Sequence, residues 1–462
     1  MKKLVLFGAG VYAKMYKSLL DYLNIPFDYY TDNDSSKYGL FLYGKEVIDP
    51  NTLPLLDCNV IISCSHGEAI KEQLKGMGIL DRLISLEDIC EIFKERISEK
   101  TMKYKNMKQQ KTVLVDMYEG IGWGGTEMWA ASVAKGLLKR GYPVALLGSQ
   151  EQESLSKEYE DMVERFSCEN TIEQMVSYML DRLPFVLLNN FSGCAYLAAV
   201  MLKMQYPKQV EIIDVIHNDN ISLFNSHMVF REWVNGFICV SDKIRNSIIS
   251  LYHIEEEKVF FKEQPILSEK DFQRKYIKEG PLRIGYAARL VKQQKRADLF
   301  PTLIDMLEKY QMPYLLEIAG EGECKCLIEE YISKNYLEDR VKVLGRIPKE
   351  DMPQFWKKQD VYLNFSEYEG TSLSMLEAMS FACVPVVTDV SGVSEFITNE
   401  YNGCVCHVGD LDSIAKEMYR LGSHRELLSE YGGLCQNIIQ TRCNPDDYME
   451  YIDRVIQRVS ND

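Results

Sequence analysis

The sequence lacks any long apolar run. Over its 462 residues, no stretch approaches the ~18 consecutive apolar residues that a membrane-spanning helix needs. The apolar part of the opening segment, Met1–Gly10, is too short for a signal peptide, and it runs directly into a glycine turn and a helix with charges. We therefore expect a cytoplasmic protein that is soluble or at most peripheral to a membrane.

Basic residues are fewer than acidic ones, with 53 Lys and Arg against 68 Asp and Glu. The formal net charge is −15 at pH 7, which argues against nonspecific binding to nucleic acid, so we expect no nucleic-acid partner. The 13 cysteines are odd in number and show no disulfide framework, which indicates reduced thiols. The sequence contains no internal repeat of solenoid length and no low-complexity tract.

The short acidic and cysteine motifs do not predict a metal site. Asp32–Asp34 and Asp410–Asp412 have the Asp-x-Asp form, but both are interpreted as turn carboxylates. The cysteines of Cys324–Cys326 and Cys404–His407 lack a second Cys-x2-Cys pair at the spacing of a zinc site. We expect no metal ligand and no required cofactor.

What the sequence does contain is a repeated alternation of short apolar runs with segments of helical periodicity. Strands are predicted at Lys3–Phe7, Phe27–Thr31, Val60–Ser63, Thr112–Val115, Val144–Leu147, Phe185–Leu188, Ile212–Ile216, Phe237–Val240, Leu282–Tyr286, Tyr314–Ala319, Val341–Leu344, Val361–Phe365 and Val384–Thr388. This alternation indicates parallel sheets covered on both faces. The predicted fold class is α/β, with two doubly wound Rossmann-like domains that face an interdomain cleft and a small α/β domain before them.

Changes in composition set the predicted boundaries. They are a small domain at 1–92, a basic helical linker at 93–111, two large domains at 112–270 and 271–440, and a helix at 441–462 that packs across the domains. Within positions 94–111, seven residues are Lys or Arg and two are Glu. This strip is interpreted either as a solvated helical linker or as a surface for peripheral contact with anionic lipid headgroups at the inner face of a membrane.

The segment from Glu369 to Glu377 is the most informative part of the chain. It follows the predicted strand Val361–Phe365, carries Gly370 in a loop, and continues as a helix. Unpaired N–H groups and the dipole at the start of such a helix favour an anion in front of the loop. The flanking carboxylates suit the hydroxyl groups of a sugar and a ribose.

This segment resembles the Glu-x7-Glu signature of retaining, nucleotide-sugar-dependent glycosyltransferases of the GT-B fold, in their large fourth family. The resemblance covers residues 112 to about 440. It implies that 112–270 is the acceptor-side domain and that 271–440 binds the nucleotide sugar. It also implies that Glu369 contacts the donor sugar and that Glu377 holds the ribose hydroxyls.

Two cations follow the predicted strand that opens the second large domain. Arg289 and Lys295 resemble the family's arginine and lysine, which implies that they stabilise the diphosphate leaving group as its charge grows. The match departs from the family in two places. Ala288 replaces a glycine, and one extra residue precedes the lysine, so Lys292 stays the alternative to Lys295.

Further blocks occur in the family's order. His217 resembles a family histidine that contacts the donor sugar. The resemblance implies that Arg289, Lys295, Glu369 and His217 form the catalytic group. The alternative interpretation of His217 is a structural histidine at the end of a strand. The remaining donor-binding residues implied by the resemblance are Gly124, Gly125, Gly345, Arg346, Ile347, Thr371, Ser372, Leu373 and Glu377.

The small domain has a turn of its own. Gly8 and Gly10 follow a strand and open a helix, and Asp32 ends the next strand, which is the context of a nucleotide-binding turn. The unit resembles the N-terminal Rossmann-like domain of bacterial sugar acetyltransferases. We leave two interpretations open: nucleotide or sugar-nucleotide binding, and a docking or regulatory module.

Together these features predict a retaining hexosyltransferase. The donor is a nucleoside-diphosphate sugar, with a UDP-sugar favoured over a GDP-sugar, and the acceptor is a glycan or a lipid-linked glycan. The resemblance implies a place in bacterial surface polysaccharide synthesis. The alternatives are an NAD-dependent oxidoreductase or epimerase centred on the first domain, and a non-catalytic scaffold with a transferase-like fold.

Overall fold

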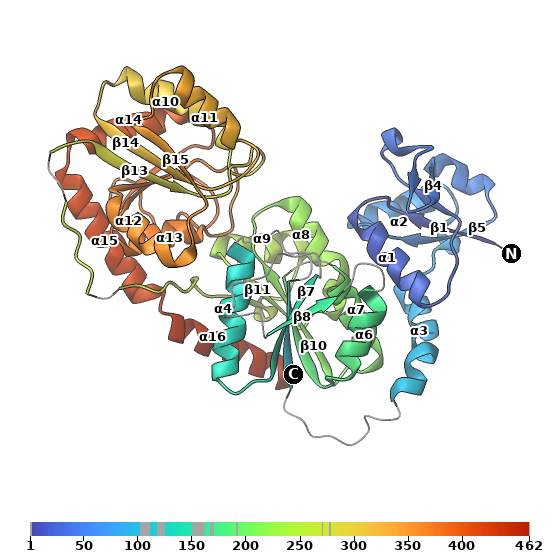
Figure 1. Ribbon diagram of the computed structural model, residues 1–462. Helices are drawn as coiled ribbons and strands as arrows, with labels where there is room; N and C mark the ends of the chain where they lie inside the picture. Colours follow the sequence, from blue (N-terminus) through green and yellow to red (C-terminus); the bar gives the residue numbers. More distant parts are fainter. Residues whose placement is uncertain are drawn as a thin grey trace. The chain divides into compact units, whose positions relative to one another are not determined.

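The computed structural model describes residues 2–101, 111–117, 125–149, 162–166, 171–190, 193–269, 271–276 and 279–461. The chain forms two compact units. The first comprises Met1–Ile216, Ile221–Ile238 and Val455–Asp462, and the second comprises His217–Asn220 and Cys239–Arg454. Three sheets, each accompanied by helices, make up the described part of the chain (Figure 1).

The small N-terminal sheet has the strand order β3-β4-β2-β1-β5. Its strands are β1 (Lys3–Phe7), β2 (Tyr29–Thr31), β3 (Phe41–Leu42), β4 (Lys45–Ile48) and β5 (Cys58–Ile62), and its helices are α1 (Val11–Tyr22), α2 (Gly67–Gly76) and α3 (Leu86–Thr101). Only the β3–β4 pair among these strands is antiparallel. Gly8 has φ of +122°, and a Cβ there would lie 2.6 Å from the carbonyl oxygen of Ser63. The turn after β1 therefore needs glycine.

The helix α3 begins at Leu86, before the linker boundary predicted at residue 93. Its apolar residues Ile89, Cys90, Phe93 and Ile97 are buried, so its first turns belong to a packed core. Half of the basic strip lies outside the described residues, because 102–110 are not among them. The proposed role of the strip stays a prediction.

The seven-stranded sheet has the order β12-β11-β10-β9-β6-β7-β8. Its strands are β6 (Thr112–Asp116), β7 (Val144–Ser149), β8 (Val163–Phe166), β9 (Phe185–Asn189), β10 (Val210–Ile216), β11 (Gly236–Cys239) and β12 (Val259–Phe261). The helices of this region are α4 (Gly125–Lys139), α6 (Thr171–Leu180), α7 (Cys194–Gln205), α8 (Ile221–His227) and α9 (Asp242–Tyr252). The central strands β6, β7, β9 and β10 pair in parallel and are almost wholly buried, which explains their continuous apolar sequences.

The six-stranded sheet lies entirely in the second unit and is parallel throughout. Its strands are β13 (Leu282–Ala287), β14 (Tyr314–Ala319), β15 (Val341–Gly345), β16 (Val361–Asn364), β17 (Val384–Thr388) and β18 (Cys404–Cys406). Its helices are α10 (Phe300–Lys309), α11 (Lys325–Lys334), α12 (Met352–Lys358), α13 (Leu373–Ser380), α14 (Leu411–Ser423) and α15 (Glu426–Arg442), and α16 (Pro445–Asn461) ends the chain.

The order of this sheet, β15-β14-β13-β16-β17-β18, is that of a Rossmann fold. The chain order reverses between β13 and β16, and ligands of open parallel sheets bind beyond the carboxyl ends of the strands at such a point. Apolar clusters cover both faces of the sheet. One of them contains Tyr286, whose ring centroid lies 4.9 Å from that of Phe300 in an edge-to-face pair. Such a pair adds roughly 0.5–1.5 kcal/mol beyond the buried area.

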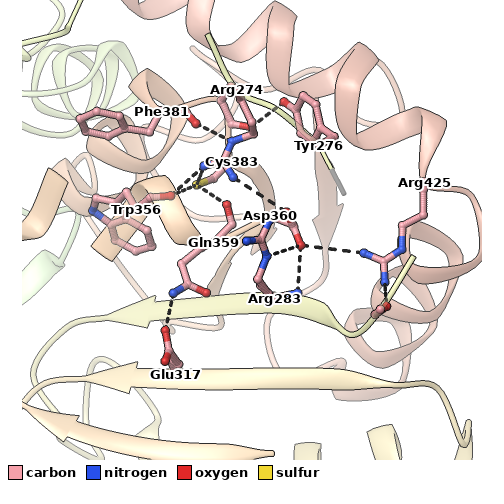
Figure 2. A network of polar contacts seen from close by, with 12 residues as sticks. Arg274, Tyr276, Arg283, Glu317, Trp356, Gln359, Asp360, Phe381, Cys383 and Arg425 are labelled. Carbon is pink, nitrogen blue, oxygen red and sulfur yellow. Dashed lines mark hydrogen bonds and ion pairs between the residues drawn. The ribbon is translucent and has the colours of Figure 1, made fainter. Parts of the chain in front are cut away.

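A buried network of charged side chains lies at the amino ends of β13 and β16, opposite the ends at which ligands bind (Figure 2). Asp360, directly before β16, accepts two side-chain hydrogen bonds from Arg283 of β13, at 3.1 and 2.8 Å. The guanidinium groups of Arg274 and Arg425 form ion pairs with Asp360 at 3.8 and 3.9 Å. Arg274 also donates to the carbonyl oxygens of Phe381 and Trp356. One carboxylate thus ties together the amino ends of two central strands, the segment before the sheet and helix α15.

The predicted α/β class with doubly wound parallel sheets is confirmed. The predicted domain boundaries stay a proposal, as does packing of the last helix across the domains.

Candidate functional site

Two loops meet at the switch point of the six-stranded sheet. The first follows β13 and contains Arg289, Gln294 and Lys295; the second follows β16 and contains Glu369. Parallel neighbours end at the same edge of a sheet, which is why Lys295 and Glu369, 74 positions apart in sequence, come together. The main chain joins the loops too, since the N–H of Glu367 donates to the carbonyl oxygen of Gln294 at 2.9 Å.

Lys295 forms an ion pair with Glu369. Both side chains are largely buried, at 13 % and 6 % exposure, so solvent screens the pair only weakly. Asn364 also donates to the same carboxylate oxygen, at 3.4 Å. Lys292 is exposed, and its backbone N–H donates to Glu323 on the outer side of the turn. The structure therefore places Lys295, and not Lys292, against the carboxylate.

Arg289 is held by a neighbour that the sequence analysis overlooked. Its Nη2 donates to the side-chain oxygen of Gln294 at 3.0 Å. The amide nitrogen of Gln294 in turn donates to the carbonyl oxygen of Tyr368 at 3.2 Å and lies 3.4 Å from Glu369 Oε2. The sequence Lys-Gln-Gln-Lys offers no local signal for this role. Only Gln294 of its two glutamines is buried, and the sequence alone does not distinguish the two.

The helix α13 begins directly after the loop of Glu369. Ser372 is its N-cap, and the Ser372 hydroxyl accepts from the N–H of Met375 at 3.4 Å. The hydroxyl of Tyr362 lies 2.9 Å from Ser372 and 3.1 Å from Ser374. Burial raises the pKa of Tyr362 to about 12, so this phenol stays neutral and links strand to helix. Leu373 is the first helical residue, and Thr371 donates from Oγ1 to the carbonyl oxygen of Val240 at 2.7 Å.

Glu377 lies in the second turn of α13. Burial raises the pKa of its carboxyl, and the positive charge of Lys349 opposes that shift only in part. Glu377 is half-buried, and a carboxylate partly withdrawn from water gains from new hydrogen-bond donors. The hydroxyl groups of a ribose would supply such donors.

Three of the predicted donor-binding residues, Gly345, Arg346 and Ile347, lie at the end of β15 and directly after it. Gly345 has φ of +68°, and its carbonyl oxygen accepts from the N–H of Gly320 at 2.8 Å, which holds the ends of β14 and β15 together. Ile347 packs against the apolar cluster that contains α13, and Arg346 follows Gly345 directly in the loop.

His217 follows β10 and belongs to the second unit. A Cβ on Gly370 would lie only 1.9 Å from the carbonyl oxygen of His217, and the N–H of Asp219 donates to the carbonyl oxygen of Glu369 at 3.0 Å. The segment 217–220 therefore lies against the backbone of the Glu369 loop, where Gly370 is required by the close approach.

The remaining predicted residues lie in the first unit. Gly124 is outside the described residues, and Gly125 is the first residue of α4. In the small domain, the N–H of Ala9, between Gly8 and Gly10, donates to Asp32 at 2.8 Å. Lys37 forms an ion pair with the same carboxylate at 3.0 Å.

The Asp32 carboxyl is held in its charged form. Burial acts to raise its pKa, but hydrogen bonds from the N–H groups of Asp34 and Ala9 and from Lys37 outweigh it, so the pKa is lowered. Gly10 caps α1 without a side-chain hydrogen bond. The choice between ligand binding and docking stays open as a prediction.

Among the described residues, no group of three or more His, Cys, Asp or Glu side chains is arranged to hold a metal ion. No helix in the described part of the chain combines the length and apolar character needed to cross a membrane.

The chain is similar to known glycosyltransferases. Residues 268–433 match the family described as "Glycosyl transferases group 1". N-acetyl-alpha-D-glucosaminyl L-malate synthase of Bacillus anthracis is 24 % identical over 52 % of this chain and 64 % of its own length. Poly(ribitol-phosphate) alpha-N-acetylglucosaminyltransferase of Staphylococcus aureus is 27 % identical over 45 % of this chain and 41 % of its own. The matches thus span less than two thirds of either relative.

Solved structures show the same fold. The Anabaena protein Alr3699/HepE, crystallised in complex with UDP and glucose, covers 76 % of this chain and 100 % of its own with a TM-score of 0.63 at 15 % identity. The chain therefore has the GT-B fold, with two Rossmann-like domains. The family match includes Arg289, Lys295, Glu369 and Glu377, all of which lie within 268–433.

Proposed function

We propose that this chain is a retaining glycosyltransferase. It transfers a hexose-type sugar from a nucleoside-diphosphate sugar, with UDP preferred to GDP, to a glycan or lipid-linked acceptor in bacterial surface polysaccharide synthesis. The group 1 family match and the names of the relatives support the class of reaction. The complex of Alr3699/HepE with UDP and glucose supports the choice of donor base.

One observation carries the proposal: Lys295 and Glu369 lie in direct contact at the switch point of a Rossmann sheet. In a nucleoside-diphosphate sugar, the anomeric carbon is bonded to an oxygen of the β-phosphate. Because the sugar and the β-phosphate are directly bonded, a protein that binds such a donor needs a cation for the phosphate close to a hydrogen-bond acceptor for the sugar hydroxyls. The contact of Lys295 with Glu369 meets that need.

The proposed reaction proceeds on one face of the sugar. The bond between the anomeric carbon and the β-phosphate oxygen breaks, and the acceptor hydroxyl oxygen bonds to the same carbon from the same side. The hydroxyl proton passes to the departing phosphate oxygen, and the nucleoside diphosphate leaves. Arg289 and Lys295 offset the negative charge that grows on the phosphate, and such fixed donors contribute about 2.7–4 kcal/mol each.

The other groups bind and orient the donor. Glu369 accepts from the sugar hydroxyls, and the half-buried carboxylate of Glu377 accepts from the ribose hydroxyls. The N–H groups of Leu373 and Ser374 open α13, where a helix offers no intrahelical acceptor, and they suit the β-phosphate. His217 approaches the sugar from the segment that lies against Gly370.

The test is a thermal-shift panel of UDP, GDP and their common sugars on the full chain, followed by product analysis with the best donor. We expect a uridine compound to raise the melting temperature most. We also expect the anomeric proton of the product, measured by NMR, to keep the configuration of the donor. No shift with any nucleotide, or a product of inverted configuration, would contradict the proposal.

A further inference from the structure

Gln294 differs from its neighbours in the turn that carries the proposed phosphate cations. Lys292 and Gln293 are exposed, whereas Gln294 is 8 % exposed. A glutamine is rarely buried unless its amide has partners. Its partners come from both loops of the site. A residue that only stabilised its own turn would not need partners in the second loop.

The two ends of the Gln294 amide face opposite charges. Its oxygen accepts from Arg289 Nη2 at 3.0 Å, and its nitrogen points to the carbonyl oxygen of Tyr368 at 3.2 Å and to Glu369 Oε2 at 3.4 Å. A third contact of 3.4 Å reaches Asn218 Oδ1. The orientation of the amide is unambiguous, because a guanidinium group has only donors and a carboxylate has only acceptors.

We propose that Gln294 is a positioning residue for sugar transfer. Its amide fixes the guanidinium of Arg289 relative to the carboxylate of Glu369, so that the phosphate and the sugar of one donor meet both groups at once. The inference rests on the proposed function and adds to it a residue that neither touches the donor nor carries charge.

A neutral amide suits this position better than any charged side chain. A carboxylate would pair with Arg289 and cancel the charge meant for the phosphate, and it would also repel Glu369. An apolar side chain would fill the same space but would leave the inner donors of Arg289 unpaired. Misplacement of a catalytic group by ~1 Å can lower a rate by about a hundredfold.

The experiment compares two near-isosteric variants of the full chain with a matched control. Gln294→Met keeps the volume and loses the amide, and Gln294→Glu keeps the shape and adds charge. Gln293→Glu makes the same charge change at the exposed neighbour. Melting temperature, kcat and KM for the donor are measured for each from pH 5 to pH 8.

We expect Gln294→Met to lower kcat by about tenfold to a hundredfold, with a smaller change in KM. Gln294→Glu should be impaired at pH 8, and its kcat relative to the unaltered chain should rise as the pH falls. The reason is that a protonated carboxyl presents one acceptor and one donor, as the amide does. Gln293→Glu should keep both the rate and the pH profile.

Two results would overturn the inference while leaving the proposed function standing. One is a Gln294→Met variant with unaltered kcat, and the other is a Gln294→Glu variant whose relative kcat does not change with pH. If the unaltered chain instead transfers sugar from no donor in the panel, the proposed function is overturned, and the inference falls with it.

Discussion

The guanidinium of Arg283 donates from Nε and Nη2 to the two carboxylate oxygens of Asp360, at 3.1 and 2.8 Å, and so ties β13 to its neighbour β16 in the six-stranded sheet. Since Arg274 and Arg425 also lie beside this carboxylate, it offsets three positive charges at once (Figure 2).

Replacement of Asp360 is therefore expected to destabilise the second unit strongly. Asp360→Ala leaves three guanidinium groups near one another without a counter-charge, at a cost of about 3–5 kcal/mol in the free energy of unfolding. Urea unfolding of the variant and of the unaltered chain measures this difference in the free energy of unfolding. The matched control is Asp339→Ala, which removes an ion pair of 3.8 Å from a carboxylate that is 77 % exposed, and should cost at most ~1 kcal/mol. Equal losses in the two variants would argue against a structural role for the network.

Lys295→Ala should abolish most of the transfer activity. Because Lys295 contacts Glu369 and Lys292 does not, we expect kcat to fall by about 10²–10³-fold in Lys295→Ala, the range found for one charge-stabilising donor. Lys292→Ala provides the control within the same turn and should stay within about threefold of the unaltered rate. The reverse ranking would reassign the phosphate lysine.

Glu377 should make donor binding sensitive to pH. Burial raises its pKa, so its carboxylate becomes protonated at a higher pH than an ordinary glutamate, and it then accepts fewer hydrogen bonds. Donor affinity, measured by calorimetry, should decline as the pH falls through this raised pKa. Glu377→Gln should bind the donor about tenfold to a hundredfold more weakly at pH 8, from the loss of a hydrogen bond to a charged group. In that variant the decline with falling pH should be absent.

Glu395 should lower stability as the pH rises. Burial raises its pKa to about 7 from an ordinary 4.5, although its carboxylate accepts from the N–H of Asp242 at 2.8 Å. The folded chain thus binds this proton more tightly than the unfolded chain, and the free energy of unfolding declines between pH 4.5 and 7. Glu395→Gln should melt at a higher temperature than the unaltered chain at pH 8 and at a similar one at pH 5. The control variant Glu257→Gln, at an exposed position, should melt at the temperature of the unaltered chain at both pH values. If Glu395→Gln also melts at that temperature at pH 8, burial does not raise the pKa of Glu395.

Gly370→Ala should impair transfer through the backbone. The added methyl group would lie 1.9 Å from the carbonyl oxygen of His217, so the Glu369 loop has to move. We expect a fall in kcat of at least about tenfold, given how steeply rate depends on placement. Gly433→Ala is a suitable control. It lies in α15 with no atom within 4 Å of the added carbon, and it should leave activity unchanged and stability equal or higher by about 0.5–1 kcal/mol.

The apolar pattern was sufficient to predict the buried strands. The bounds predicted for β1, β14 and β17 match the structure to the residue, because apolar residues predominate in each strand and most of them are buried. Strands β3, β4, β8, β12 and β18 were not predicted. They have two to four residues each, and β8, Val163–Phe166, carries two charged side chains at its centre. Short runs of this kind form strands only because a neighbouring strand supplies the hydrogen bonds.

The site was predictable where a charged residue follows a strand. Lys295 and Glu369 could be named from sequence, and the structure brings them together. Gln294 and the ion pairs of Asp360 could not be predicted from the sequence. The role of an uncharged turn residue, like that of three arginines distant in sequence, depends on which strands are neighbours in the sheet. Sequence spacing carries no information on that point until the strand order is known.

The strand β16 is only four residues long, Val361–Asn364, yet it separates Asp360 at one end from Asn364, which contacts Glu369, at the other. The ion pairs of Asp360 and the residues proposed to bind the donor therefore lie at opposite ends of one short strand. Under the proposed function, changes in the loops at one end can alter the sugar preference, while the ion pairs at the other end hold the sheet together.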